Sequence, residues 1–432
     1  MFTTDLFSNC KNNAQRLLSA ALLAGLLCVA GSAQAVVGMN QKVFEQMQKA
    51  QLAAEEEDFE SAHDIISGLQ TRRRLNEHEL AQVKNLEGNI YTLEKNYDAA
   101  IESFETIVND IDRKQIPEGL LESALQVLVQ LSMVGEDYKQ AIAYSDQLLA
   151  IKKQPDSNVM AMRAQCFYHQ EEYDAAKQAI NDAIDIESAL GNAAKENWLL
   201  LLNAVHHFRS DYQAMVPVLN ELIRLYPNDK YVYNLAAVYG QLEQQKEQLL
   251  LLEPLYESGF LTQRSQKMLL AQLFMAEGVP VKAAKLLDKE LDWRNAHVGE
   301  DATVDQRDLE MLAQAWILAK EPKRAIEPLQ IAATMAEDGD VYLRLAHTHI
   351  SLADWASAEQ AIIQALKKGE LRNEGNAVVL LGMAQYRLKE FNQAIETFSR
   401  AKGMQSVADV SQQWLKYVRN QKEKYELADA NP

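Results

Sequence analysis

The feature that most constrains this chain is a small residue that recurs 12 positions before an alanine, with an aromatic side chain 3 positions before that alanine. Gly88, Tyr97 and Ala100 show the pattern. Four further copies are Ala50–Phe59–Ala62, Ala164–Tyr173–Ala176, Ala346–Trp355–Ala358 and Gly382–Phe391–Ala394. Two more pairs, Ala271 with Ala283 and Ala313 with Ala325, carry proline in the aromatic slot. Recurrence at this period indicates an array of like units.

The spacing has a physical cause, because two antiparallel helices can cross closely only where their side chains are small. We expect Gly88 and Ala100 to meet at such a crossing, with Phe104 and Ile107 on the same face of the second helix. The pattern resembles the tetratricopeptide repeat (TPR), a helix–turn–helix unit of about 34 residues. The resemblance implies an all-α fold, a right-handed α-solenoid of stacked repeats. The alternative is a generic alanine-rich helical bundle, which would not show the period.

The second-helix positions of the pattern also count the repeats. They fall at Ala62, Ala100, Ala141, Ala176, Met215, Ala283, Ala325, Ala358 and Ala394. The interval of 68 residues between Met215 and Ala283 is twice 34, so we predict a divergent repeat between residues 229 and 263. This gives about ten repeats over 36–405, then a capping helix over 406–428 and a disordered tail over 429–432. The insertion around Gly299 is the best candidate for a flexible break.

The first 35 residues have a different character. Lys11 and Arg16 precede an apolar run over 17–30, and Ala33 and Ala35 then supply the small residues that a signal peptidase reads. The run is 14 residues long, short of the roughly 20 that span a bilayer. We therefore predict a cleavable signal peptide over 1–35, a mature chain that begins at Val36, and a periplasmic location. The alternative is a retained anchor. No later segment is long and apolar enough to be transmembrane.

Charge and cysteine content narrow the possible partners. The formal net charge is −18, and it becomes −19 without the signal peptide, which carries one net positive charge. Such acidity argues against nucleic acid or an anionic membrane surface as a binding partner. It favours a basic partner, or serves only to keep the protein soluble. Only Cys166 would remain in the mature chain, so no internal disulfide can form. We expect Cys166 to be a packed core thiol.

Signals of catalysis are weak. The chain has no phosphate-binding glycine loop and no serine nucleophile elbow. His78-Glu79 begins like a zinc-protease helix, but Gln82 stands where the second histidine must be. His347 and His349 are two residues apart, which places them on different faces of a helix. We therefore predict no enzymatic activity, no cofactor and no metal site.

The first helices of such repeats line a concave groove, whose inward positions can be counted from the anchors. In the first full repeats these positions are polar and uncharged, and our candidate peptide-binding residues are Gln82, Asn85, Asn89, Gln126, Gln130, Asn158, Gln165 and Tyr168, with Thr92, Ser123 and Asn197 beside them. Amides offer both a donor and an acceptor, which suits the backbone of an extended peptide. Further along, the positions are apolar: Tyr233, Met268, Met275, Ile317, Leu343, Ile350, Val379 and Met383. The alternative is that these side chains only solvate or pack the superhelix.

A closer resemblance lies in the middle of the chain. The segments "WLLLLNAVHHFRSDYQAMVPVLNELIRLYP", "LYESGFLTQ" and "LAQLFMAEGVPVKAAKLLDKEL" are similar to the periplasmic TPR proteins encoded beside TonB–ExbB–ExbD energy-transduction genes in marine gammaproteobacteria. The resemblance implies an accessory of TonB-dependent uptake of siderophores or similar nutrients, with periplasmic parts of that complex as partners. Two alternatives are a general cell-envelope assembly factor and an accessory solenoid of a cell-wall enzyme. The lysine–asparagine clamp of chaperone-binding relatives is absent.

Overall fold

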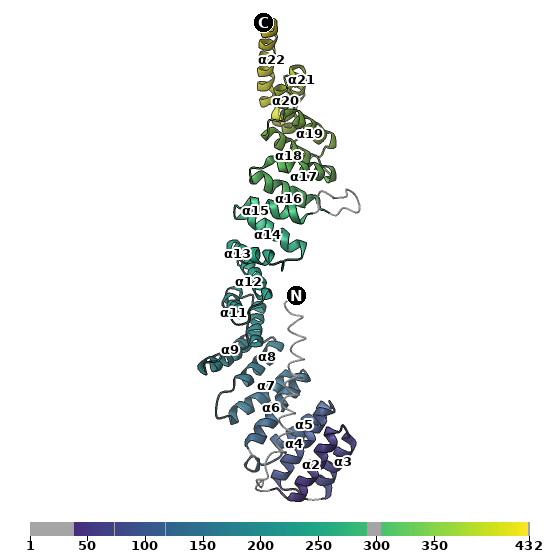
Figure 1. Ribbon diagram of the computed structural model, residues 1–432, viewed down its shortest axis with the longest axis vertical. Coiled ribbons are helices and arrows are strands. Elements are labelled where there is room, and N and C mark those ends of the chain that lie inside the picture. The colour runs from purple at the N-terminus through teal and green to yellow at the C-terminus, as the bar shows by residue number, and fades with distance from the viewer. Residues whose placement is uncertain (1–38, 73, 117, 292–303, 431–432) are drawn as a thin grey trace. The chain divides into compact units, whose positions relative to one another are not determined.

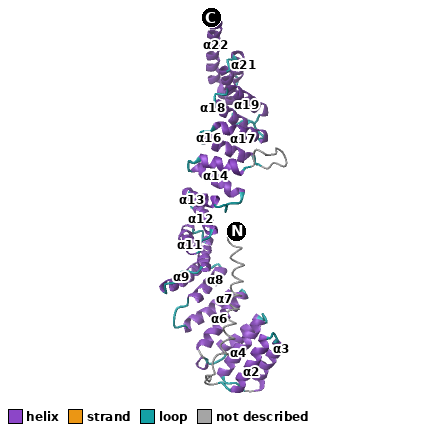
Figure 2. Ribbon diagram, in the orientation of Figure 1, coloured by secondary structure: helices purple, strands orange, loops and turns teal. Residues whose placement is uncertain are grey.

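A computed structural model describes residues 39–72, 74–116, 118–291 and 304–430. These residues form helices and loops, with no strand among them (Figure 2). The chain divides into two compact units between Val238 and Tyr239, each of which is described by itself. The predicted signal peptide over 1–35 and most of the insertion around Gly299 lie outside the described residues.

The helices follow one another in helix–turn–helix pairs (Figure 1). The first unit contains α2 (Gln41–Glu55) and α3 (Phe59–Arg72), α4 (Glu77–Leu93) and α5 (Tyr97–Asn109), α6 (Glu118–Val134) and α7 (Tyr138–Ile151), α8 (Ser157–His169) and α9 (Tyr173–Ala189), and α10 (Glu196–Phe208) and α11 (Tyr212–Leu225). The short 3-10 helix η1 (Arg113–Gln115) precedes α6. The unit boundary falls inside α12 (Asp229–Gln241).

The second unit continues with α13 (Gln245–Glu257), α14 (Arg264–Ala276) and α15 (Pro280–Glu290), α16 (Gln306–Leu318) and α17 (Pro322–Met335), α18 (Asp340–Ser351) and α19 (Trp355–Lys368), α20 (Glu374–Arg387) and α21 (Phe391–Lys402), η3 (Gln405–Val407) and α22 (Ala408–Ala430). The predicted α-solenoid fold is confirmed, and α12 and α13 are the helices of the predicted divergent repeat. α22 includes residues 429 and 430, which we expected to be disordered; its last described residues, leucine and alanine among them, favour helix.

One turn joins the two helices of every pair. In all ten, one residue has positive φ: Glu57, Lys95, Glu136, Glu171, Ser210, Glu243, Gly278, Lys320, Ala353 and Lys389. The next residue donates its N–H to the carbonyl five positions back, as Asn96 does to Tyr91 at 2.9 Å. Asn96 then caps α5, its side chain accepting from the N–H of Ala99 at 3.4 Å. This turn residue fixes a common register for all repeats.

Facing positions in the two helices of a repeat are matched in size. Gly88 lies against Phe104, because a Cβ added to Gly88 would sit 2.7 Å from the Phe104 ring. Gly382 and Phe398 repeat this arrangement, also at 2.7 Å. Where the first position is alanine, the second is isoleucine or leucine, as in Ala50–Ile66, Ala164–Ile180, Ala271–Leu287, Ala313–Leu329 and Ala346–Ile362, all buried. The third repeat inverts the order, with Val129 and Ser145, both 0 % exposed.

The divergent repeat shows why its sequence is hard to recognise. Gln248 lies five residues after the turn residue Glu243, where Ala100 lies five residues after Lys95. Gln248 is nevertheless buried, 7 % exposed. Gly240 makes the room, because a Cβ there would lie 2.6 Å from Gln248 Nε2. A long amide therefore takes the place of the small residue in the second helix. Gly240 provides the space for it, four residues after Ala236, which holds the first-helix position that is small in other repeats.

Candidate functional site

The candidate binding residues share four positions of the repeat register, 13, 10, 6 and 3 residues before the turn residue. Steps of three and four residues place them on one face of each first helix. Gln82, Asn85 and Asn89 lie on α4, Gln126 and Gln130 on α6, and Asn158, Gln165 and Tyr168 on α8. We call this set the amide strip.

The part of the amide strip farthest from the turns is accessible. Gln126 and Asn158 are exposed, and Gln82 and Asn85 are half-buried. Gln165, only six residues before its turn residue, is half-buried as well. Ser123 and Asn197, at equivalent positions of α6 and α10, are exposed as well. Asn158 Oδ1 accepts from Lys195 Nζ at 2.6 Å, which ties α8 to the residue that precedes α10. An uncharged set of donors and acceptors is thus presented by consecutive first helices.

Three of the four candidates nearest the turns are buried, and for these our prediction of an open groove was wrong. Asn89, Gln130 and Tyr168 are only 8 %, 3 % and 6 % exposed. The first helices α2 and α4 contact one another, as do α8 and α10, which brings a neighbouring first helix close to the helices that carry Asn89 and Tyr168. Gln130 Oε1 is buried and has no hydrogen-bond partner among the described residues.

An aromatic cluster covers Tyr168. The Phe208 ring meets that of Tyr168 edge-on at 5.7 Å and stacks on Tyr173 at 5.4 Å. Phe208 remains 42 % exposed. Tyr138 stacks on His169 at 4.5 Å, beside Tyr168. These contacts join rings from three consecutive repeats, a grouping that a pattern within one repeat does not reveal.

The apolar continuation predicted for later repeats is mostly half-buried. Met268, Met275, Ile317, Leu343, Ile350 and Met383 are half-buried in the second unit, as is Tyr233 in the first. Val379 is buried, 8 % exposed. These side chains therefore contribute to packing as well as to a surface.

The histidines, Cys166 and Glu79 do not come together in one site. His349 is buried while His347 is exposed, so they share no site. Cys166 is buried, which raises the pKa of its thiol to about 12 and keeps it protonated. The carboxylate of Glu79, next to His78, accepts hydrogen bonds from the backbone N–H groups of Asn76 and Asn40, the N-cap residues of α4 and α2. Among the described residues no group of three or more His, Cys, Asp or Glu is arranged to hold a metal ion.

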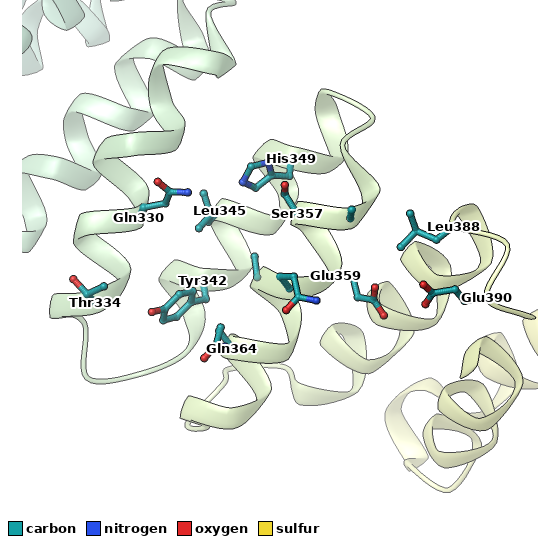
Figure 3. A pocket seen from close by; sticks show the side chains of 13 residues that line it. Gln330, Thr334, Tyr342, Leu345, His349, Ser357, Glu359, Gln364, Leu388 and Glu390 are labelled. Carbon is teal, nitrogen blue, oxygen red and sulfur yellow. The ribbon is translucent and has the colours of Figure 1, made fainter. Parts of the chain in front are cut away.

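A cleft of about 700 Å³ lies in the second unit, and the sequence did not suggest it. It is lined by Gln330 and Thr334 of α17, by Tyr342 and His349 of α18, by Ser357, Glu359 and Gln364 of α19, and by Leu388 and Glu390 (Figure 3). Glu359 accepts from Gln385 Nε2 at 3.1 Å. Burial, and then the charge of Glu359, raise the pKa of Glu390. Much of the lining comes from the second helices α17 and α19. The repeat pattern does not include the lining positions of these helices, so it could not indicate the cleft.

Three cleft-side residues have the composition of a catalytic triad but not its order of contacts. Asp354 Oδ1 accepts from the Ser357 N–H at 3.2 Å, and Asp354 Oδ2 lies 3.1 Å from His349 Nδ1. The Ser357 hydroxyl and N–H bond to Asp354 and lower the pKa of its carboxyl group. In a triad the histidine stands between the acid and the serine. This arrangement is instead a cap of α19, tied back to α18.

Two segments of the chain match a known family. Residues 343–408 and 81–109 each match the tetratricopeptide repeat. A search of curated proteins found no match. None of the described helices combines the length and apolar character that a membrane span requires.

Similar solved structures also carry this repeat. One from Parabacteroides merdae, a tetratricopeptide repeat protein, is 17 % identical over 61 % of this chain and 98 % of its own, with a TM-score of 0.30. The TPR2AB domain of yeast Sti1, in a complex with pHSP90, is 16 % identical over 70 % and 99 %, with a TM-score of 0.25. The C-terminal part of a TPR protein from Cytophaga hutchinsonii is 12 % identical over 67 % and 95 %, with a TM-score of 0.37.

Proposed function

We propose that this chain, two segments of which match the tetratricopeptide repeat, is a non-enzymatic adaptor that binds an extended peptide segment of another protein. The observation that carries the proposal is the accessible part of the amide strip: Gln82, Asn85, Gln126, Asn158 and Gln165. They lie at equivalent positions of consecutive first helices, and none is charged. A peptide backbone offers alternating donors and acceptors, which amides can match without regard to side-chain sequence.

The proposed setting is the periplasm, reached by cleavage of the signal peptide over 1–35. The proposed partner is a periplasmic part of a TonB–ExbB–ExbD complex, in an accessory role for siderophore or other nutrient uptake. Support for both comes from the leader sequence and from the resemblance of the middle of the chain. N-terminal sequencing of native protein tests the location: it should begin at Val36, and a retained Met1 would contradict it.

Binding is tested by replacing four accessible amides together, Gln82, Asn85, Gln126 and Asn158, with alanine. One amide contributes only roughly 0.5–1.5 kcal/mol of net hydrogen bonding, so single changes could escape detection. Four that are all engaged would lower affinity by roughly two to four orders of magnitude. The assay is in-cell photocrosslinking from position 123, an exposed serine beside the amide strip on α6 that no variant alters. Captured proteins are identified by mass spectrometry, and affinity for the captured segment is then measured.

The matched control replaces the exposed second-helix amides Gln140, Gln178 and Asn220 with alanine. Both variants should keep the helical circular dichroism of the wild type, and only the first should lose capture. Unchanged capture by the amide-strip variant would place binding elsewhere.

Growth on a nutrient that requires TonB-dependent uptake separates the TonB role from general envelope assembly. Loss of an assembly factor would instead alter outer-membrane composition. A cell-wall hydrolase assay tests the third alternative.

A further inference from the structure

The cleft of the second unit is lined by a glutamate that the repeat pattern does not require. Glu359 lies six residues after the turn residue Ala353. Four other repeats have isoleucine at this position: Ile101, Ile142, Ile326 and Ile395. Glu359 is nevertheless buried, only 8 % exposed. A buried carboxylate destabilises a fold unless donors or a cation compensate its charge. The packing of the repeat therefore gives no reason for a glutamate here.

Polar side chains hold Glu359 in one orientation. Gln385 is 6 % exposed and donates from Nε2 to Glu359 Oε1 at 3.1 Å. The Thr397 hydroxyl donates to Gln385 Oε1 at 2.7 Å, which turns the amide nitrogen toward the carboxylate. Among the described residues Gln385 is the only donor to this carboxylate, so Glu359 Oε2 has none. A carboxylate that is positioned by two successive contacts and left half unpaired is typical of a binding group.

A second glutamate of the cleft, Glu390, is also not used by its own repeat. It is the N-cap residue of α21 but makes no capping bond. In other repeats the side chain at this position does cap its helix, as in Asn96, Asp137, Asp211 and Asp354. The uncapped glutamates Glu172 and Glu321 are exposed. Glu390 Oε2 is instead buried and has no hydrogen-bond partner among the described residues.

The two carboxylates form a pair that no cation neutralises. Figure 3 shows them turned toward one another, and burial together with their repulsion raises the pKa of Glu390. Among the described residues no ion pair includes either carboxylate. The nearest cations in sequence are engaged elsewhere: the Arg387 guanidinium lies 5.3 Å from the Trp355 ring. The Lys389 ammonium lies 5.0 Å from the Tyr425 ring. The pair therefore lacks a positive group, and the cleft beside it has room for one.

We propose that Glu359 and Glu390 together bind the guanidinium group of an arginine in a partner polypeptide. A guanidinium has five N–H donors in one plane, so it can serve two carboxylates at once. A metal ion fits less well, since it prefers more oxygen ligands than two carboxylates supply. Beyond the pair, the cleft of about 700 Å³ is lined by the amides Gln330, Gln360 and Gln364, which suit a peptide backbone. The net charge of −18 also attracts a basic partner.

This site is separate from the amide strip, whose residues all belong to the first unit. Each proposal can therefore fail while the other stands.

Isothermal titration calorimetry of the purified full chain with the peptide acetyl-Gly-Gly-Arg-Gly-Gly-amide tests the proposal. The control peptide carries citrulline, which keeps the shape of the arginine side chain but is uncharged. We expect a Kd of about 1 mM or tighter for the arginine peptide and at least roughly tenfold weaker binding of the citrulline peptide. Equal affinities, or no binding of the arginine peptide, would overturn the proposal. Free arginine that binds more tightly than the peptide would overturn the assignment to a polypeptide.

Two isosteric variants test the residues. Glu359→Gln and Glu390→Gln should each weaken binding of the arginine peptide roughly tenfold and leave the citrulline peptide unaffected. Glu390→Gln should also raise the thermal unfolding midpoint of the free chain, because it removes the repulsion within the pair. A purely structural glutamate would show the opposite, a lower midpoint with unchanged binding, and that result would refute the proposal. The matched control is Glu321→Gln, at the same turn position but exposed, which should change neither. Tight binding of Ca²⁺ that Glu359→Gln abolishes, without binding of the peptide, would replace the guanidinium by a metal ion.

Discussion

Replacement of Gly88 by alanine probes the size matching between the two helices of a repeat. The new methyl group would lie 2.7–3.0 Å from three carbons of the Phe104 ring, and the ring is 0 % exposed, so it has little room to move. Overpacking of this kind costs roughly 1–3 kcal/mol. Alanine regains about 0.5–1 kcal/mol through its better helix propensity. We expect a net loss of about 0.5–2 kcal/mol.

The informative variant is the double one. Phe104→Leu alone should also destabilise, by about 1 kcal/mol or more, because it leaves a void beside Gly88. Combined, Gly88→Ala and Phe104→Leu recreate the alanine–leucine pair that occurs at these positions in other repeats, so stability should return close to that of the wild type. The coupling between the two changes should be about 1–3 kcal/mol in favour of the double variant.

Thermal unfolding followed by circular dichroism measures the effect, and 1 kcal/mol corresponds to about 2–4 °C for a unit of this size. The reciprocal set serves as the control: Ala164→Gly and Ile180→Phe should each lower the midpoint, and together should recover it. Changes that add within about 0.5 kcal/mol in both sets would show that the two positions are not matched, and would refute the reasoning.

Three further predictions concern stability. Lys95→Gly should raise the free energy of unfolding by about 0.5–1 kcal/mol because Lys95 has φ of +64°, whereas Gly278→Ala, at φ of +72° in the equivalent turn, should lower it by about 1 kcal/mol. Thermal unfolding measures both changes, and changes of the same sign would contradict the prediction. Gln130→Met should stabilise by up to about 1 kcal/mol in chemical denaturation, since it removes a buried acceptor that has no partner; a loss would reveal an unseen hydrogen bond. Burial lowers the pKa of both His169 and His206, so the unfolded chain takes up their protons first and stability should fall as pH drops below 6.5. Melts from about pH 7.5 to 5.5 should show a smaller fall in a His206→Gln variant, and an unchanged slope would exclude His206 as a contributor.

The repeat pattern was sufficient to predict the fold because its cause is local. Gly88 and Ala100 sit within one repeat, and the short connection between their helices fixes their distance. The divergent repeat was found from an interval rather than from its residues, since Gln248 replaces the small residue and Gly240 provides the space. A search for small residues at a fixed spacing misses such a repeat. The interval of 68 residues between Met215 and Ala283 reveals it.

Accessibility at the candidate site could not be predicted in the same way. Asn89 and Gln130 have the residue types of Asn85 and Gln126 and lie on the same helix face, one turn further along, yet they are buried. Their exposure depends on which other helices pack against them, and the residue type at one position does not encode that packing. The cleft beside Glu390 has the same origin, because it forms where three helices and a turn meet.

The size matching between facing positions has a consequence for how such a chain can change by recombination. Each matched pair, such as Gly88 with Phe104, lies inside a single repeat, 16 residues apart. An exchange of DNA whose ends fall between repeats moves both members together and keeps every pair intact. An exchange whose ends fall in the turn at Lys95 would join a glycine to an isoleucine, or an alanine to a phenylalanine. The loops between repeats, and not those within them, are therefore the places where this gene can be cut and rejoined without loss of the fold.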